Sequence, residues 1–272
     1  MDELTQKVKL ANKQFYSLIS NNYESIDGRR TFILKKWVLN NIQNKKGTFL
    51  DIGCGNGRFL IACKYKGFGT YGIEGSVAAR SVASKKELFI YTKDFLSQEF
   101  KSKKFDVVTL WQVLEHIDDP NRYLSKIKKI IKKDGLLYIG LPNIESTQYL
   151  MFRSRWFHLD LPRHMFAYSP RTLKAMLKKN GFDIFYIDYN YLEYNPFGFF
   201  QSFFNVILPV FNFVYKIIKR GKKPHTVLTL FSGFVVLLLF LPVVVLSLIF
   251  YLIEIIFRKG ATFGVYAKIR NV

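Results

Sequence analysis

The fold of this chain is decided by the stretch Phe49-Leu50-Asp51-Ile52-Gly53-Cys54-Gly55-Asn56-Gly57-Arg58-Phe59-Leu60. An apolar run ends on an acid, breaks into alternating glycines and resumes as a helical pattern, which predicts a strand, a tight turn and the start of a helix. Glycine takes positive φ angles and leaves no Cβ between the backbone and a bound molecule. The turn therefore predicts a ligand lying against bare peptide, with an ordinary strand-to-helix turn as the alternative.

The spacing of the glycines argues against a dinucleotide. A nicotinamide fingerprint would place its third glycine three residues after Gly55, where this chain has Arg58. The G-x-G-x-G pattern instead resembles the first motif of class I S-adenosylmethionine-dependent methyltransferases, whose loop passes under the methionine part of the cofactor. The resemblance implies that S-adenosyl-L-methionine is bound by this motif, through Asp51, Gly53, Cys54, Gly55 and Gly57.

Further pieces of the same pattern follow in order. A second short strand, 71–74, ends on Glu74 roughly 20 residues after the glycine loop, where such folds place a carboxylate on ribose hydroxyls. A third strand, 88–91, is followed by Asp94 and Phe95. These two residues could offer an acceptor and a stacking ring to adenine, although an acid at a strand end can equally cap a helix or a turn.

The fourth strand, 105–111, is a continuous apolar run of the kind buried on both faces of a parallel sheet. By the resemblance, Trp111 and Gln112 at its end also belong to the cofactor site. The following segment, 112–120, resembles the L-E-H-x-x-D-P signature of a methyltransferase branch that includes the ubiquinone-type O-methyltransferases.

The alternation of strands and helices predicts an α/β fold with a doubly wound sheet. A helix over 121–133, a turn at Asp134-Gly135 and a fifth strand over 136–141 continue the series. The resemblance implies a seven-stranded Rossmann-like sheet in which the last strand lies antiparallel beside the sixth. We expect four segments, which are a helical cap over 1–46, the methyltransferase core over 47–189, an α-helical insertion over 190–262 and the final strand over 263–272.

Two histidines are candidates for acid and base chemistry. Methyl transfer from a sulfonium is an in-line displacement, so the enzyme must position the acceptor and, for a hydroxyl, remove a proton. His116 follows the fourth strand, where open α/β sheets bind ligands, and His164 precedes the next helix in a segment that covers the acceptor side in the resembling enzymes. A structural role beside Glu115, or a simple helix entry, is the alternative for each. We expect acceptor contacts from Trp156, Arg163 and Tyr168.

Composition bounds the setting of this chemistry. Cys54 and Cys63 fit neither a metal-ligand spacing nor a disulfide framework, so a reduced, cytoplasm-facing protein without a metal site is expected. The chain carries 41 Lys and Arg against 20 Asp and Glu, a formal net charge of +21. Nucleic acid and anionic lipid are both suitable neighbours, and a merely solvated basic surface is the alternative.

An apolar run over 227–257 favours lipid, because it exceeds the roughly 18 residues that indicate a membrane segment. Pro242 at its centre predicts a break into two short arms. Since strands of one sheet flank the run and basic residues stand on both sides, we expect a re-entrant or monotopic hairpin, two tight crossings being possible. An aromatic segment, 196–208, is expected to lie at the interface. An ordinary helical subdomain or a dimer interface is the alternative.

Together these features predict a membrane-associated methyltransferase that O-methylates a lipid-linked acceptor, such as an isoprenoid quinone precursor, a polyprenyl-linked sugar or a glycolipid. The chain has Trp111-Gln112-Val113-Leu114 where resembling nucleobase methyltransferases carry an Asn-Pro-Pro-aromatic motif, which argues against nucleic acid. Two alternatives remain, a membrane-bound RNA or protein methyltransferase and a non-catalytic membrane scaffold that retains the fold.

Overall fold

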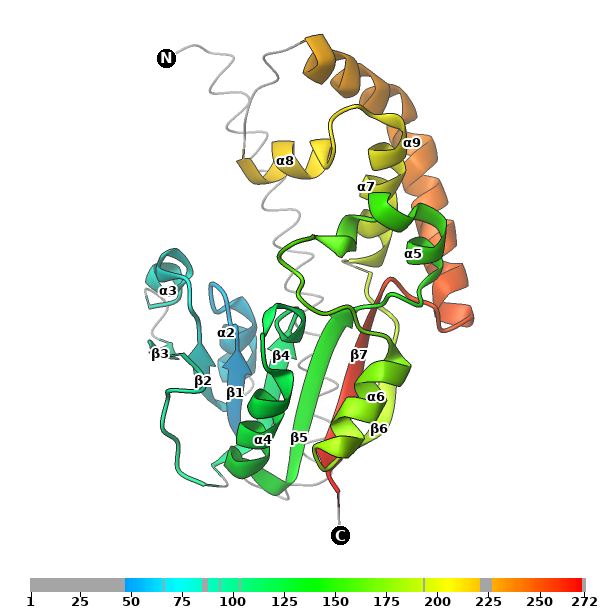
Figure 1. Ribbon diagram of the computed structural model, residues 1–272. Coiled ribbons are helices and arrows are strands. Elements are labelled where there is room, and N and C mark those ends of the chain that lie inside the picture. Colours follow the sequence, from blue (N-terminus) through cyan, green and yellow to red (C-terminus); the bar gives the residue numbers. More distant parts are fainter. Residues whose placement is uncertain are drawn as a thin grey trace. The chain divides into compact units, whose positions relative to one another are not determined.

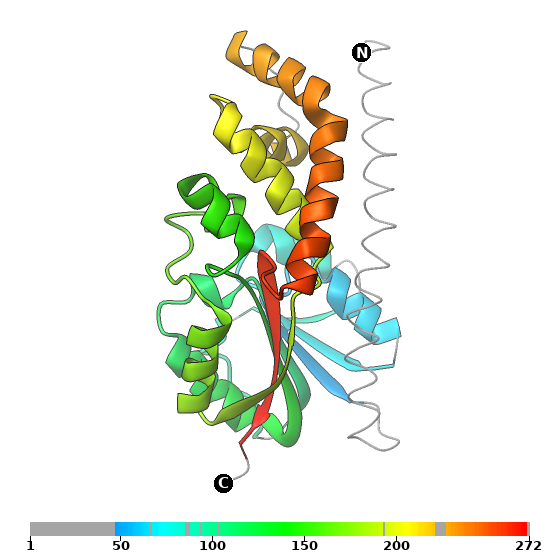
Figure 2. The same cartoon turned by 90° about the vertical axis from the view of Figure 1, so that its right-hand side faces the viewer.

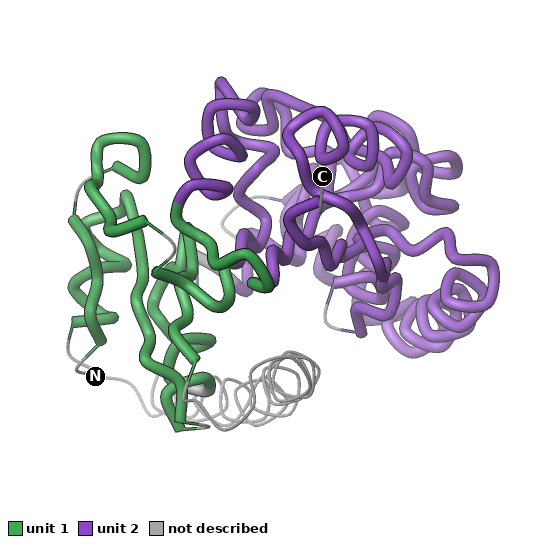
Figure 3. Tube along the Cα trace, turned by 90° about the horizontal axis from the view of Figure 1, so that it is seen from below, with its two compact units in different colours: residues 1–108, 130–135 green, residues 109–129, 136–272 purple. Residues whose placement is uncertain are grey.

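The computed structural model describes residues 47–65, 67–84, 88–92, 94–102, 104–192, 194–220 and 227–270, so the expected helical cap over 1–46 lies outside the described residues. The chain divides into two compact units (Figure 3). Unit 1 comprises residues 1–108 and 130–135, and unit 2 comprises residues 109–129 and 136–272.

The described strands form one seven-stranded sheet in the order β3-β2-β1-β4-β5-β7-β6 (Figure 1). The neighbouring strands β1, β2 and β3 pair in parallel, whereas β7 runs antiparallel to both β5 and β6. This topology confirms the predicted Rossmann-like sheet and its antiparallel last strand. The strands are β1 (Thr48–Ile52), β2 (Gly69–Ile73), β3 (Phe89–Tyr91), β4 (Phe105–Trp111), β5 (Ile131–Pro142), β6 (Phe182–Asp188) and β7 (Thr262–Ile269).

Unit 1 holds the glycine turn between β1 and the helix α2 (Arg58–Tyr65), and the helix α3 (Val77–Ser84) between β2 and β3. Phe49 of β1 is completely buried, and its ring meets those of Phe59 and Phe68 edge-on. The apolar run of the sequence therefore forms the core of this unit, and the turn that follows it rests on a packed strand.

The fifth strand is longer than expected, because Asp134-Gly135 lies within β5 and not in a turn before it. A Cβ on Gly135 would come within 2.6 Å of Ile131 Cγ1 and 3.1 Å of the Asp106 carbonyl oxygen, so only glycine fits this close approach. The buried Asp106 carboxylate nearby accepts hydrogen bonds from the Thr48 amide at 2.7 Å and from Lys132 Nζ at 2.8 Å.

Unit 2 carries helices on its strands, and α6 shows how the sequence positions them. Ser169 accepts a hydrogen bond from the Thr172 amide, and Thr172 accepts one in return from the Ser169 amide, so a capping box starts the helix. Leu173 and Leu177 are fully buried, and α6 contacts β6. The other short helices here are α4 (Pro120–Ile130), α5 (Thr147–Phe152), α6 (Pro170–Lys179) and the 3₁₀ turns η1 (Leu114–His116), η2 (Arg153–Arg155) and η3 (Phe157–Leu159).

The insertion between β6 and β7 consists of α7 (Asn195–Ile207), α8 (Phe213–Arg220) and α9 (Val227–Ile256). Figure 2 shows α7 lying along α9, and the two helices are in contact. The aromatic helix α7 is largely packed inside the unit, with Phe199, Phe200 and Phe204 buried. The arms of the observed hairpin are thus α7 and α9.

The apolar run does not break at Pro242 as expected, because α9 continues through it as one helix of 30 residues. Proline removes one helical hydrogen bond, but neighbouring helices make this tolerable. Val243, the next residue, is buried in a cluster with Phe200 and Phe204 of α7. Among the described residues, α9 is the one helix whose length and apolar composition would suffice to cross a membrane, which is weak evidence when taken alone.

Candidate active site

The glycine turn of unit 1 has the backbone that its sequence predicts. Gly53, Gly55 and Gly57 all have positive φ angles, of 75°, 54° and 75°. A Cβ on Gly57 would lie 2.3 Å from Leu88 Cδ1, whereas one on Gly55 would meet nothing within 4 Å. Gly57 is therefore required by packing. Gly55 leaves open space against bare peptide, which fits a cofactor lying over the turn.

The carboxylate of Glu74 is tied to this turn. Its Oε2 accepts a hydrogen bond from the Gly55 amide at 2.8 Å, and its Oε1 accepts one from the Ser76 amide at 2.7 Å. Asp51, at the end of β1, is buried. Burial raises the pKa of the Cys54 thiol, and the charges of Asp51 and Glu74 raise it further, so this thiol stays neutral. The predicted members of the turn thus lie together in unit 1.

Asp94 and Phe95, which were expected to contact adenine, have different surroundings. Asp94 is exposed, and its Oδ2 accepts a hydrogen bond from the Leu96 amide at 2.8 Å. Phe95 is 1% exposed and its ring lies 6.1 Å from that of Phe100. The carboxylate therefore caps a surface turn and the ring belongs to the core, so their predicted contacts with a cofactor stay predictions.

Trp111 and Gln112 stand at the end of β4 in unit 2. The Trp111 ring packs on that of Tyr138, with centroids 4.0 Å apart. Gln112 has a φ of 52°, uncommon for a residue with a side chain, and its amide donates to the Gly140 carbonyl at 2.9 Å. Such backbone strain is concentrated at functional sites. Gln112 also lines the principal pocket of this unit.

This pocket has a volume of about 430 Å³ and draws its walls from three parts of unit 2. The predicted residues His116, His164 and Arg163 line it, and α8 of the insertion contributes Tyr215 and Lys216. The complete lining is Gln112, His116, Phe157, His158, Asp160, Arg163, His164, Asn212, Tyr215 and Lys216. Sequence reasoning gave no signal for α8, because its residues follow His116 by about a hundred positions.

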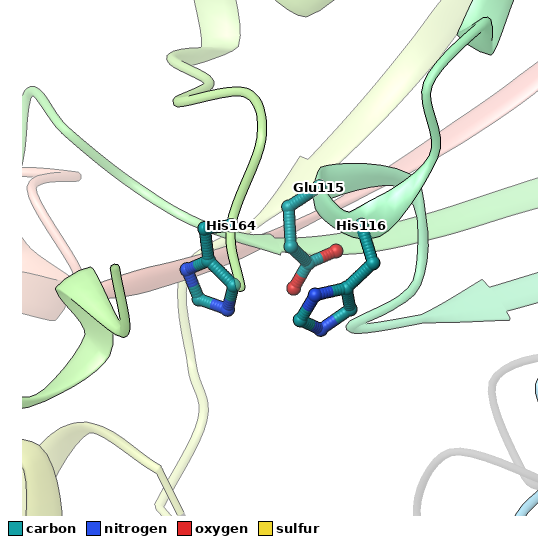
Figure 4. Close-up of side chains that lie close together, drawn as sticks. All are labelled: Glu115, His116 and His164. Carbon is teal, nitrogen blue, oxygen red and sulfur yellow. The ribbon is translucent and has the colours of Figure 1, made fainter. Parts of the chain in front are cut away.

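A buried carboxylate lies beside the two predicted histidines (Figure 4). The rings of His116 and His164 have centroids 4.8 Å apart, and Glu115 is 1% exposed. Neither carboxylate oxygen of Glu115 has a hydrogen-bond partner. Burial raises the pKa of this carboxyl group to about 8. Glu115 was not among the predicted site residues, although it stands inside the L-E-H motif.

The two imidazoles are held differently. His116 Nδ1 lies 2.9 Å from the Arg163 carbonyl oxygen. Because a carbonyl only accepts, Nδ1 carries the proton in this arrangement, and Nε2 keeps a free electron pair. Burial and the neighbouring charge of His116 lower the pKa of His164. Arg163 itself is paired with Asp160 at 3.0 Å.

Trp156 and Tyr168 lie beside the main pocket. With His158 and His164 they line a smaller cavity of about 30 Å³. Trp156 Nε1 and the Tyr168 hydroxyl are both buried without a hydrogen-bond partner. Burial lowers the pKa of His158 to about 4, so its ring is neutral, and its Nε2 lies 3.3 Å from the Tyr194 carbonyl oxygen.

Polar side chains of α7 fix the walls of the main pocket. Ser202 Oγ accepts from the Phe157 amide at 2.8 Å, and Gln201 Oε1 accepts from the Tyr215 amide at 2.8 Å. Phe157 and Tyr215 are both lining residues. The insertion is therefore part of the pocket's construction and not an appendage to it.

With this geometry in hand, the chain can be compared with known proteins. A family model described as "Methyltransferase domain" matches residues 23–187. The chain belongs to this methyltransferase family. The match confirms the family recognised from the glycine turn, and with it S-adenosyl-L-methionine as the expected cofactor. Most of the insertion and the last strand lie beyond the matched segment.

Among curated proteins, the chain is 25% identical over 162 residues to the ubiquinone biosynthesis O-methyltransferase of Bartonella quintana, covering 54% of this chain and 64% of that protein. It is 33% identical over 115 residues to the enzyme of the same name from Glaesserella parasuis, covering 38% and 48%. The chain thus spans about half to two thirds of the length of these relatives.

Among solved structures, a SAM-dependent methyltransferase from Archaeoglobus fulgidus superposes with a TM-score of 0.54 at 19% identity, covering 93% of this chain and 99% of that one. A chain in a complex of the Haloferax volcanii Trm112 methyltransferase activator with a methyltransferase gives a TM-score of 0.51 at 14% identity, covering 93% and 96%. At these identities the likeness shows the fold alone.

Proposed function

We propose that this protein is a membrane-associated methyltransferase that O-methylates a lipid-linked acceptor, with S-adenosyl-L-methionine as the methyl donor. The observation that carries the proposal is the construction of the pocket in unit 2. His116 and His164 line it together with Tyr215 and Lys216 of α8, and α8 belongs to an insertion with an apolar outer surface. The acceptor chemistry and the proposed lipid contact thus meet in one unit.

The exposed side of α9 supports a lipid environment. Leu237 and Leu241 are 77% and 72% exposed, and further leucine, valine and phenylalanine side chains surround them on the outer side of the helix. The buried side carries polar residues instead, among them Ser247 and Glu254. A helix that turns apolar groups outward and polar groups inward suits an apolar solvent, since so much exposed apolar surface is unfavourable in water.

The path of the chain supports entry and exit on one side of the bilayer. Asn195 at the start of α7 accepts hydrogen bonds through Oδ1 from the amide of Thr262, at 3.0 Å, and from its hydroxyl, at 2.7 Å. The two ends of the insertion therefore lie together beside β7. Basic residues at 216–223 and at Arg258 and Lys259 favour an anionic, cytoplasmic lipid surface.

On the donor side, the backbone turn and one carboxylate supply the binding groups. The open space over Gly55 would receive the methionine part of the cofactor, and Glu74, held by the Gly55 amide, would accept from the ribose hydroxyls. Bound S-adenosylmethionine supplies an electrophilic methyl group. What remains for the protein is to bring an acceptor oxygen into line with it and to exclude water.

On the acceptor side, a histidine would take the proton that the acceptor loses. As the oxygen bonds to the methyl carbon, the carbon–sulfur bond breaks and its electron pair stays on sulfur, leaving a neutral thioether. The hydroxyl proton passes to a base, for which His116 Nε2 is placed, because its Nδ1 is engaged by the Arg163 carbonyl. The relatives named as ubiquinone biosynthesis O-methyltransferases support oxygen as the methylated atom.

The lipid-linked acceptor is inferred from the pocket's shared wall. An isoprenoid quinone precursor, a polyprenyl-linked sugar and a glycolipid all combine a hydroxyl-bearing head with a long apolar chain. The head would occupy the 430 Å³ pocket and the chain would leave toward the insertion. Arg163 and Lys216 on the lining suit a head group that carries negative charge.

The proposal is tested by transfer of label from methyl-labelled S-adenosylmethionine to an extract of membrane lipids, using full-length protein in vesicles. We expect labelled product in the organic phase, and tight calorimetric binding of S-adenosylmethionine and S-adenosylhomocysteine but not of a nicotinamide dinucleotide. Label in RNA or protein would favour the first alternative. Correctly folded protein that binds neither sulfur ligand would instead be a scaffold.

A pair of glycine variants gives this experiment its control. Gly55→Ala places a Cβ in the space proposed for the cofactor, and we expect at least tenfold weaker binding of S-adenosylmethionine. Gly67→Ala is matched to it, because Gly67 also has a positive φ, of 89°, and nothing within 4 Å of its Cβ position. Both changes cause similar backbone strain. Equal losses of affinity in the two variants would contradict the assignment of the turn.

A further inference from the structure

We propose that Glu115, His116 and His164 bind a divalent transition-metal ion such as Zn²⁺ at the side of the main pocket. The ion would hold a hydroxyl oxygen of the acceptor, a role that rests on the function proposed above. The metal site itself stands on the geometry of unit 2 alone.

The first support is the donor set and its spacing. One ligand atom from each of the three residues lies within 4.8 Å of the others. In a tetrahedral zinc site with bonds of about 2.1 Å, ligand atoms are roughly 3.4 Å apart, so small side-chain rotations suffice to close the site. Two imidazoles and one carboxylate are the ligands of a well-known kind of catalytic zinc site. Figure 4 shows the Glu115 carboxylate between the two rings.

The second support is the unsatisfied carboxylate. Glu115 is 1% exposed, and neither of its oxygens has a hydrogen-bond partner within the described part of the chain. Buried polar groups are nearly always partnered, and a buried carboxylate without partners is costly. A hydrogen bond from the nearby Tyr168 hydroxyl would satisfy only one of the two oxygens. A bound cation would balance the charge of the whole group.

The third support is the outer contacts of the imidazoles. His116 places Nδ1 on the Arg163 carbonyl at 2.9 Å, and His164 hydrogen-bonds the backbone of His158. Each ring is thus oriented through one nitrogen, which leaves the other for the cluster. Histidines that bind metals usually have such a second contact, which fixes the tautomer and the direction of the ring.

The cluster is also open toward substrate. His116 and His164 line the main pocket, whereas Glu115 does not. With three protein ligands, a zinc ion keeps a fourth position for water or substrate. A hydroxyl bound there would lose its proton more readily, because the ion stabilises the oxyanion. The metal would therefore activate the acceptor whose proton a histidine alone would otherwise have to remove.

The test uses full-length protein in detergent, freed of metal with a chelator and titrated with Co²⁺ and then Zn²⁺. We expect one Co²⁺ per chain, with the visible absorption bands of a nitrogen and oxygen ligand set, and displacement by Zn²⁺. Glu115→Gln preserves the shape of the side chain and His164→Asn removes a second ligand. Each should weaken Co²⁺ binding at least tenfold while binding of S-adenosylmethionine stays unchanged.

The matched control is Asp160→Asn, which removes a carboxylate that lines the same pocket but lies outside the cluster. Asp160 has a φ of 34°, a conformation that asparagine tolerates, so this variant should fold and bind Co²⁺ as the natural protein does. Equal loss in Asp160→Asn and Glu115→Gln would place the cation on the exposed acid and overturn the proposal.

Two further outcomes separate this proposal from the function. Protein that binds S-adenosylmethionine but no Co²⁺, or a Glu115→Gln variant with undiminished Co²⁺ affinity, would overturn the metal site and leave methyl transfer untouched. Specific metal binding without label transfer to lipid would support the site and count against the proposed function instead.

Discussion

Helices α6 and α9 of unit 2 bury opposite kinds of side chain. In α6 the buried residues are Leu173 and Leu177, while Arg171, Lys174 and Lys178 are exposed. In α9 the buried residues include Ser232, Ser247 and Glu254, while a long series of leucine, valine and phenylalanine side chains is exposed. One unit thus contains a helix suited to water and a helix suited to an apolar surrounding.

The polar groups buried by α9 are not orphans as a class. Ser247 donates to the Val244 carbonyl at 2.7 Å, Tyr251 is hydrogen-bonded to Asn190, and Gln148 donates to Glu254 at 3.2 Å. These contacts fix α9 to the rest of unit 2 by directional bonds, whereas α6 is fixed by apolar burial. This is the division expected when the surrounding solvent changes from water to lipid, since apolar contact then gains little.

The largest expected effect comes from placing charge on the outer side of α9. In the double variant Leu237→Lys and Leu241→Lys, each lysine near the helix centre should cost about 3 kcal/mol of membrane insertion. We expect loss of binding in a flotation assay with anionic vesicles. The control is Ala175→Lys at an exposed position of α6, which should float as the natural protein does. Undiminished flotation of the double variant would remove the contrast between the two helices.

The sequence predicts α6 well, because its signals are local. Ser169 and Thr172 mark its start, Leu173 and Leu177 repeat at helical spacing, and Gly181 follows its end with a φ of 80°. The glycine turn is equally local, since an apolar strand and glycines at fixed spacing determine it. Strand order followed from the same periodicity together with the family resemblance.

The candidate site was predicted only in part, since its remaining contacts are not local. His116 and His164 were identified one by one, but nothing in their spacing brings Glu115 between rings that stand 48 positions apart in the chain. Tyr215 and Lys216 reach the pocket only because α7 fixes α8 to it. The continuous helix through Pro242 was missed for the same reason, because packing against α7 overrides the local effect of proline.

The second prediction compares leucines of the two helices. Leu173→Ala empties a fully buried site in α6 and should lower the free energy of unfolding by about 2–5 kcal/mol. Leu241→Ala, in a side chain 72% exposed, should change it by less than about 0.5 kcal/mol. Urea unfolding in detergent micelles measures both. A large loss for Leu241→Ala would mean that another part of the protein, or a second copy, covers this side of α9.

The smallest expected effect separates two serines with different tasks. Ser169→Ala removes the cap of α6 and leaves the Thr172 amide without its partner, which should cost about 1 kcal/mol of unfolding free energy. Ser232→Ala removes a hydroxyl that donates to the Leu228 carbonyl, one turn earlier in α9, at 2.7 Å. Such a bond within a helix supplements the backbone ladder and does not complete it, so we expect a change below about 0.5 kcal/mol. The same urea titrations compare the two variants directly. If Ser232→Ala cost as much as Ser169→Ala, the polar groups on the buried side of α9 would be essential contacts within unit 2, and the contrast with α6 would lie in the strength of its polar bonds as well as in the surrounding solvent.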